Sequence, residues 1–238
     1  MLKHIVCGFS LMVSLLYADN QWEHYKDRTI ASIKNIAGWC SDDKAFLIMD
    51  IIKNHQPQLC VEIGVFAGKS LYPIAKAIQY NRSGKVLAID AWNSKIATQG
   101  FARTDPNYAW WNQLNYNQFY YNTLSLINQS NLAQYCTLIK KSSQEALELF
   151  ADESIDFIHF DGNHNAEFAF WDVYNYFPKV KDSGYILLND PNWASMTRSL
   201  TFLLERADIV SSFSRSASLL LLRKNKERMQ KAAFLFKD

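Results

Sequence analysis

The chain has few cysteines, with only four among its 238 residues. Their spacing matches neither a zinc site nor a disulfide framework. Cys60 and Cys136 fall in segments that we expect to be core strands, where a free thiol packs as a small apolar side chain. Cysteine usage therefore favours a reducing compartment.

A strong excess of one charge is also missing, since the formal net charge is +2 and 20% of the residues are charged. This balance gives no indication of a nucleic acid or a membrane surface as partner. Residues 224–238 alone are basic, and we expect a solvated tail or terminal helix there, with a phosphate-rich partner as the other interpretation. The basic residues are Lys224, Lys226, Arg228, Lys231 and Lys237.

No apolar run reaches the roughly 20 residues that a membrane span requires. Residues 1–18 nevertheless begin with a short positive segment, continue with an apolar one and end at Ala18 before polar Asp19. Two interpretations stay open: a secretory signal cleaved after Ala18, or a buried apolar helix. Cleavage would remove Cys7 and would mean export.

The chain also lacks repeats, linkers and low-complexity blocks, which predicts a single main domain over residues 57–223 behind N-terminal helices over residues 19–56. Gly38 would end the first of these helices and Ser41 would cap the second. Expected strands cover residues 59–63, 85–90, 136–139, 157–160 and 185–188, expected helices cover 70–80, 108–127, 143–150, 166–177 and 193–206, and a hairpin with its turn at 214–216 joins 209–213 to 217–223.

This alternation of apolar strands and helices predicts an α/β fold. The expected sheet is doubly wound, Rossmann-like and mostly parallel, with seven strands and an antiparallel C-terminal hairpin. Ligands of such sheets bind at the carboxyl ends of the strands.

Several nucleotide and hydrolase motifs are missing: the G-x-G-x-x-G fingerprint, the G-x-S-x-G elbow and the G-x-x-x-x-G-K-[ST] loop. The first strand instead leads into Glu62-x-Gly64-x-x-x-Gly68-x-Ser70. The two glycines let the backbone approach a ligand, and the helix N-terminus behind them offers free N–H groups. This pattern predicts a small-molecule site and argues against a nicotinamide-dependent oxidoreductase.

Polar residues follow the other strands as well. Asp90 ends the second strand, where a carboxylate can accept from both hydroxyls of a ribose. One acidic residue after a strand is usually a turn residue or helix cap, but five polar strand ends indicate a site. The remaining ones are Ser142–Gln144, Asp161–His164 and Asn189–Asp190.

On these residues the chain resembles the class I S-adenosylmethionine-dependent methyltransferases. It is most similar to the catechol-type and macrolide-sugar-type O-methyltransferases, and so is methyltransferase family 24-like. The resemblance covers residues 55–223 and is carried by Glu62–Ser70 (E-x-G-x-x-x-G-x-S), Ser143–Glu145 (S-Q-[DE]), Asp161–His164 (D-G-x-H) and Lys181–Ile186 (the K-P-G-G turn, with Ser183 in place of a glycine).

The resemblance implies S-adenosyl-L-methionine as the cofactor. By this resemblance Asp90 would bind the ribose, and Ser143 with Gln144 would bind the adenine. The methionine part would be held by Glu62, Gly64, Gly68 and Ser70.

The resemblance also implies a catalytic site with Asp161 and His164, the latter as the base that accepts the proton of the substrate. Asp161 and Asp190 would bind Mg²⁺, with Asn189 or Asn192 as a third ligand. The Asn189-Asp190 pair departs from the family's usual metal pairs. Metal-assisted transfer and metal-free transfer with His164 as base therefore both stay open.

Other side chains have competing interpretations. His164 could instead be a surface residue at a helix start. For His159 we favour a core histidine over a zinc ligand. The aromatic segment around Trp110 is expected to pack in the core, whereas Trp92 and Trp193 are expected to line the substrate pocket.

The leading hypothesis is an O-methyltransferase acting on a hydroxyl of a small molecule, such as a sugar or phenol. The alternative is a catalytically inactive cofactor-binding protein of the same fold. We expect no nucleic-acid partner and no stable membrane span, and a homo-oligomer is compatible with the sequence. Cofactor supply and cysteine usage favour the cytoplasm, unless residues 1–18 are cleaved and the protein is exported.

Overall fold

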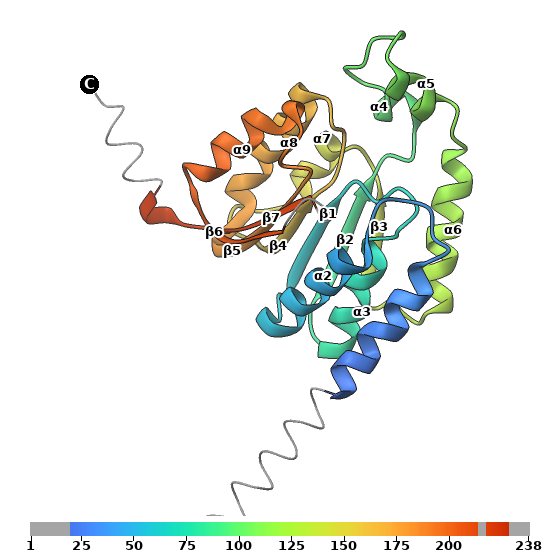
Figure 1. Ribbon diagram of the computed structural model, residues 1–238, viewed down its shortest axis with the longest axis vertical. Helices are drawn as coiled ribbons and strands as arrows, with labels where there is room; N and C mark the ends of the chain where they lie inside the picture. Colours follow the sequence, from blue (N-terminus) through green and yellow to red (C-terminus); the bar gives the residue numbers. More distant parts are fainter. Residues whose placement is uncertain (1–19, 214–217, 229–238) are drawn as a thin grey trace, which may run out of the picture.

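The structure is a computed structural model that describes residues 20–213 and 218–228 (Figure 1). The signal-like segment, the hairpin turn at 214–216, Lys231 and Lys237 lie outside the described residues. Among the helices that are described, none is both long and apolar enough to cross a membrane.

A seven-stranded sheet forms the centre of the domain, in the order β3-β2-β1-β4-β5-β7-β6. Strands β1 to β5 pair in parallel, whereas β7 is antiparallel to both β5 and β6. The predicted doubly wound sheet with its C-terminal hairpin is thereby confirmed. The strands are β1 (Leu59–Ile63), β2 (Lys85–Asp90), β3 (Cys136–Lys140), β4 (Ile155–Phe160), β5 (Val180–Asn189), β6 (Ala207–Phe213) and β7 (Leu219–Lys224).

Helices cover both faces of this sheet (Figure 1). One apolar cluster joins the sheet to the N-terminal helix (residues 20–33), α2 (Asp42–His55), α3 (Leu71–Asn81) and α6 (Tyr116–Gln129). The other cluster joins it to α7 (Ser143–Ala146), α8 (Ala166–Tyr176) and α9 (Thr197–Leu204). Between β2 and α6 lie α4 (Ser94–Ala97) and α5 (Pro106–Asn112), and short 3-10 turns cover Leu147–Leu149, Phe177–Lys179 and Ala194–Met196.

Side chains of the central strands alternate between the two clusters. In β2, Val86 and Ala88 are buried in the first cluster and Ile89 in the second. In β4, Phe157 faces the first cluster and Ile158 the second. Because both faces are buried, these strands are continuous apolar runs, and this is why they could be recognised from their sequence.

Some boundaries differ from the predictions. The N-terminal helix ends at residue 33 and not at Gly38, whereas Ser41 caps α2 as predicted, accepting from Lys44 N at 3.2 Å. The helix expected over 108–127 is interrupted because Asn115 caps α6 by accepting from Gln118 N. Strand β5 begins earlier than predicted, with residues 181–184 bulging between its pairings to β4.

The basic residues near the end of the described chain differ in their surroundings: residues 226–228 are helical and exposed, as expected for a terminal helix, whereas Lys224 belongs to the sheet. Lys224 is buried in β7 and its Nζ donates to the carbonyls of Phe177 and Val180. Lys226 forms an ion pair with Glu153 at 2.6 Å. Lys224 is therefore part of the fold, whereas Lys226 makes an ion pair at the surface.

Candidate active site

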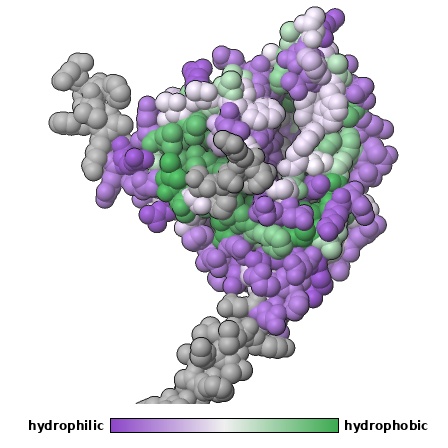
Figure 2. All heavy atoms as spheres, viewed as in Figure 1, coloured by the Kyte–Doolittle hydropathy of each residue, from purple (hydrophilic) through white to green (hydrophobic). Residues whose placement is uncertain are grey.

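A cavity of about 880 Å³ opens at the carboxyl ends of the strands. The strand order reverses at β1 and β4, which is where doubly wound sheets bind their ligands. Figure 2 shows the surface hollowed between the α4–α5 segment and the part that carries α8. The walls come from residues within 37–40, 63–70, 89–116, 142–144, 161–172 and 189–195.

The loop between β1 and α3 forms the floor of the cavity and depends on Gly64. This residue has a φ of +86°, and a Cβ placed on it would lie 2.1 Å from the carbonyl oxygen of Asp161. Only glycine allows β1 and the β4 loop to approach this closely. Gly68 is also in the left-handed region, with a φ of +85°. Ser70, just before α3, lines the same cavity.

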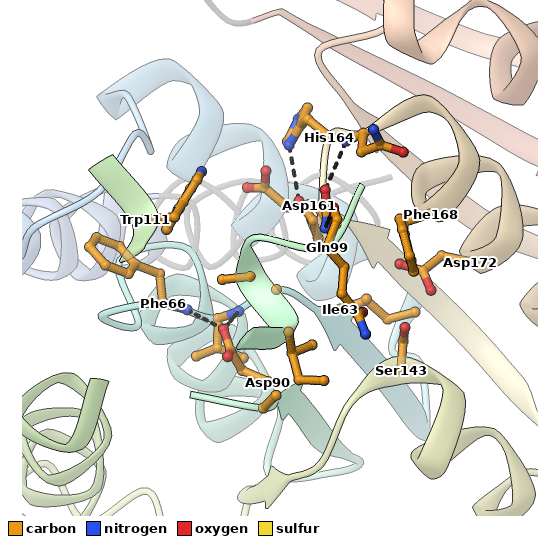
Figure 3. Close-up of a pocket in the computed structure, with 18 of the residues that line it drawn as sticks. Ile63, Phe66, Asp90, Gln99, Trp111, Ser143, Asp161, His164, Phe168 and Asp172 are labelled. Atoms are coloured by element: carbon orange, nitrogen blue, oxygen red, sulfur yellow. Dashed lines mark hydrogen bonds between the residues drawn. The ribbon is translucent and has the colours of Figure 1, made fainter. Parts of the chain in front are cut away.

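Asp90 holds this loop in place from the end of β2 (Figure 3). Its Oδ2 accepts from the N–H groups of Val65 at 3.0 Å and Phe66 at 2.9 Å, and its Oδ1 accepts from Trp92 N at 2.7 Å. Burial raises the pKa of Asp90, and these hydrogen bonds oppose that shift. A carboxylate offers about four acceptor positions, so about one remains for a ligand, not the two expected for a ribose.

Glu62 does not line the cavity, although we expected it beside the cofactor. It is fully buried, and its Oε1 lies 3.0 Å from His159 Nδ1. Burial raises the pKa of Glu62 to about 8, despite a hydrogen bond with Ser70. Burial and the Lys44 charge depress the pKa of His159 well below its usual value. Burial thus favours the neutral form of both groups, and His159 is a core histidine as favoured from the sequence.

Ser143 and Gln144, which we predicted to bind the adenine, also line the cavity. Ser142 caps α7 there and forms a capping box with Glu145. Asp172 in α8 also lines the cavity, is 5% exposed and has an Oδ1 without a hydrogen-bond partner. Burial raises the pKa of Asp172 to about 7, although a hydrogen bond from Ser143 opposes this.

His164 lies in the cavity wall in contact with Asp190. Its Nδ1 is 3.0 Å from the Gly162 carbonyl oxygen, and because a carbonyl only accepts, this nitrogen carries the proton. Its Nε2 lies 3.2 Å from Asp190 Oδ2, off the axis of a hydrogen bond. Burial disfavours the imidazolium, but the contact with Asp190 and the negative charge of Asp161 outweigh it and raise the pKa of His164.

Lys44 lies beside Asp161 and Asn189, although it was not among the predicted site residues. Its Nζ lies 3.0 Å from Asp161 Oδ2 and 2.6 Å from Asn189 Oδ1, and its side chain is 2% exposed. Burial disfavours the ammonium, yet the Asp161 carboxylate raises the pKa of Lys44 above its usual value. A signal was present: Lys44 shares a helix face with buried Ile48 and Ile52, where a lysine is unusual.

The predicted Mg²⁺ ligands do not fit a metal in this arrangement. The Lys44 ammonium already binds Asp161 Oδ2 and Asn189 Oδ1, and Asn189 Nδ2 donates to Asp190 Oδ2 at 2.8 Å. The remaining predicted ligand, Asn192, accepts instead from Ser218 Oγ. Throughout residues 20–213 and 218–228, no cluster of three or more His, Cys, Asp or Glu side chains could hold a metal.

Aromatic side chains form the wall beside the glycine loop. Trp39, Phe66, Trp110 and Trp111 all line the cavity, with ring centroids 4.5 to 6.1 Å apart. Trp39 is 70% exposed. The expectation that most of this segment is core was therefore wrong for the two tryptophans of α5.

The two tryptophans predicted for the pocket differ from each other. Trp193 lines the cavity, with its ring centroid 5.0 Å from that of His164. Trp92 is buried and donates from Nε1 to the Phe66 carbonyl at 2.8 Å, so it supports the loop from behind.

The segment that contains α4 is tied to the loop after β4. Asn163 Nδ2 donates to the carbonyl of Gln99, which is labelled in Figure 3, at 2.9 Å. Asn165 Nδ2 donates to the Gly100 carbonyl at 2.9 Å. Gln99 and Gly100 thereby join the cavity wall, which no motif predicted.

A family model described as a methyltransferase domain matches residues 61–191, more than half of the chain. No curated protein matches the sequence. Similar solved structures include the methyltransferase PaMTH1 of Podospora anserina bound to S-adenosylhomocysteine (SAH), with a TM-score of 0.57 and 11% identity, covering 86% of this chain and 87% of that one.

Two further structures are O-methyltransferases. TomG of Streptomyces achromogenes, in complex with S-adenosylmethionine, has a TM-score of 0.57 and 12% identity over 84% of this chain and 89% of its own. The Bacillus cereus enzyme, in complex with SAH, has a TM-score of 0.53 and 14% identity over 86% of this chain and 91% of its own. The chain thus belongs to the methyltransferase-domain family that it matches and has the fold of the class I S-adenosylmethionine-dependent methyltransferases.

Proposed function

We propose that this protein transfers the methyl group of S-adenosylmethionine to a hydroxyl oxygen of a small molecule that carries an apolar ring. The main support is that one cavity is lined by the glycine loop, Asp90 and Ser143 and also by His164. A nucleoside cofactor and a methyl acceptor could therefore bind next to each other in this cavity, with no protein between them. O-methyltransferases among the similar structures support an oxygen acceptor.

In this proposal the cofactor occupies the part of the cavity between the glycine loop and α7. Gly64 and Ser70 receive the methionine part, one oxygen of Asp90 accepts from the ribose, and Ser143 with Gln144 meets the adenine. Gly68 does not line the cavity and instead shapes the turn between Gly64 and Ser70. Glu62 supports the loop from behind and does not contact the ligand, because it is buried against His159.

His164 is the proposed base. The Gly162 carbonyl holds the proton on Nδ1, so Nε2, which is buried beside Asp190, carries the lone pair that would accept the hydroxyl proton. The oxygen then attacks the methyl carbon, the carbon–sulfur bond breaks, and the electron pair stays on sulfur to give SAH. Asp190, 3.2 Å from Nε2, stabilises the imidazolium that forms.

The acceptor class follows from the aromatic wall. Phe66, Trp110 and Trp111 offer apolar faces beside the glycine loop, and such faces bind rings through burial and stacking. We therefore propose phenols and ring-bearing alcohols or sugars as the acceptors to try first.

Two measurements test this function. SAH at about 100 times its Kd should stabilise the protein by about 2.7 kcal/mol, whereas NAD should not. Labelled methyl from S-adenosylmethionine should appear on at least one member of a hydroxyl panel, and His164→Ala should lower that rate about 100-fold or more. Stabilisation by SAH without transfer to any acceptor would instead support an inactive cofactor-binding protein.

A further inference from the structure

Two side chains at the ends of β4 and β5 share one buried cation. Asp161 follows β4 and Asn189 ends β5, and the Lys44 ammonium lies within hydrogen-bond distance of an oxygen from each. Lys44 reaches this point from the first turn of α2, where Ser41 caps the helix. The ammonium therefore comes from α2, whereas the sequence motifs describe residues at the ends of the strands.

The oxygens around Lys44 are the ones that a divalent metal would need. Mg²⁺ binds oxygens at about 2.0–2.1 Å and takes about six of them. The Asn189 side chain has only one oxygen, and it lies 2.6 Å from Lys44 Nζ, so a metal bound to it would lie close to the ammonium. A metal ion on this oxygen and the Lys44 ammonium would repel each other strongly, because the site is buried.

An ammonium differs from a metal in its chemistry. It supplies one positive charge and three N–H donors, but it has no coordination position at which a substrate oxygen could bind and lose its proton. Lys44 does not line the cavity and has no direct contact with an acceptor there. It orients Asp161 and Asn189, and it is a positioning residue.

We propose that Lys44 permanently occupies the position that Asp161, Asn189 and Asp190 would otherwise offer to a divalent cation, so that the site excludes the metal and transfer proceeds without it. This inference deepens the proposed function, since it leaves proton removal to His164. It also implies that the same oxygens could bind a metal if the ammonium were absent. Removing the positive charge should expose this metal site.

Binding of Mn²⁺, followed by the loss of its free-ion electron paramagnetic resonance signal, tests the proposal without turnover or cofactor. The wild-type protein should show no saturable Mn²⁺ site. Lys44→Ala should bind one Mn²⁺ at least about tenfold more tightly than the wild type, and excess Mg²⁺ should compete. Adding Asp161→Asn to Lys44→Ala should abolish the gain.

Two further variants complete the design. Lys53→Ala removes a lysine from the last turn of the same helix and should bind no Mn²⁺. Lys44→Gln keeps a hydrogen-bond donor without the charge, and it is the second choice if Lys44→Ala does not fold by circular dichroism; it should gain the site as well.

The proposal is overturned if the wild type binds one Mn²⁺ in a manner that Asp161→Asn abolishes, or if folded Lys44→Ala and Lys44→Gln gain no site. The wild-type titration decides by itself if neither variant folds: absence of an Asp161-dependent site supports the proposal. Stabilisation by SAH is measured separately, so a failure of the proposed function leaves the Mn²⁺ result readable.

Discussion

The carboxylate of Asp90 connects two functions that are usually assigned to different residues. Its hydrogen bonds to Val65 and Phe66 set the shape of the glycine loop, and its remaining acceptor position faces the cavity. A change at Asp90 should thus affect ligand binding both directly and through the loop.

We expect Asp90→Asn to raise the Kd for SAH at least about tenfold, because the new NH₂ group cannot accept a hydrogen bond and one N–H of the loop or ligand loses its partner. Calorimetric titration with SAH measures the change. Asp156→Asn is the matched control, since Asp156 also accepts from two backbone N–H groups, those of Gln58 and Leu59, but at the amino end of β1. Equal affinities of SAH for the two variants would refute the role of Asp90.

The pH dependence of transfer follows from the charges around His164. The Asp190 and Asp161 carboxylates face the imidazole and raise its pKa above 6.5, and the neutral form is the base. The rate should therefore rise with pH, with a midpoint above 6.5. Asp190→Asn removes one negative charge, so the His164 pKa should fall and the midpoint should move to lower pH, with a lower maximal rate. A midpoint in kcat/KM that does not move would argue against this pair.

At the scale of single residues, the sequence correctly indicated that the polar side chains after the strands lie close together. Asp161, His164, Asn189 and Asp190 come together because parallel strands place their carboxyl ends at one edge. Lys44 was missed because its contact with Asp161 spans 117 positions and no local motif encodes it. Asp161, Asn189 and Asp190 were therefore predicted as metal ligands, whereas in the structure two of them bind the ammonium of Lys44, which comes from α2.

Among the elements, the turn from β1 into α3 is the most tightly constrained. Gly64 N donates to the Ile89 carbonyl at 3.0 Å, and the Gly64 backbone lies against the Asp161 carbonyl. Both neighbouring strands therefore pack against this single position.

Gly64→Ala should lower the free energy of unfolding by about 2–4 kcal/mol more than Gly38→Ala. Both glycines have a positive φ, but a Cβ at Gly38 would lie no closer than 3.5 Å to its neighbours, whereas at Gly64 it would meet backbone at 2.1 Å. Comparing the two variants therefore separates the cost of the close contact with backbone from the cost of the positive φ angle. Urea unfolding of the two variants measures it, and equal losses would contradict the packing argument.

Among the elements, the strands were predictable where they form short apolar runs between turn residues. Strands β1 and β2 have the predicted bounds, because each is buried on both faces between turns. The break before α6 and the bulge in β5 were not, since the first depends on one Asn115 side chain and the second on register with a distant strand. Local competition of this kind leaves no periodic pattern.

On the scale of the whole molecule, the N-terminal region is part of the site and not an appendage to it. Trp39 and Cys40 line the cavity, and α2 supplies Lys44. Apolar side chains also gather on the surface over β6 and β7 in Figure 2, where Ile209 and Val210 are exposed. That surface lies away from the cavity and enters none of the proposed chemistry.

The central claim is that the cavity at the carboxyl ends of β1 and β4 binds an S-adenosyl compound. Isothermal titration of the folded protein with SAH tests it most directly. We predict one bound SAH per chain, with affinity weakened by Asp90→Asn and unchanged by Asp156→Asn. An absence of heat from the folded wild-type protein, at SAH concentrations up to the millimolar range and at two temperatures, would contradict the claim.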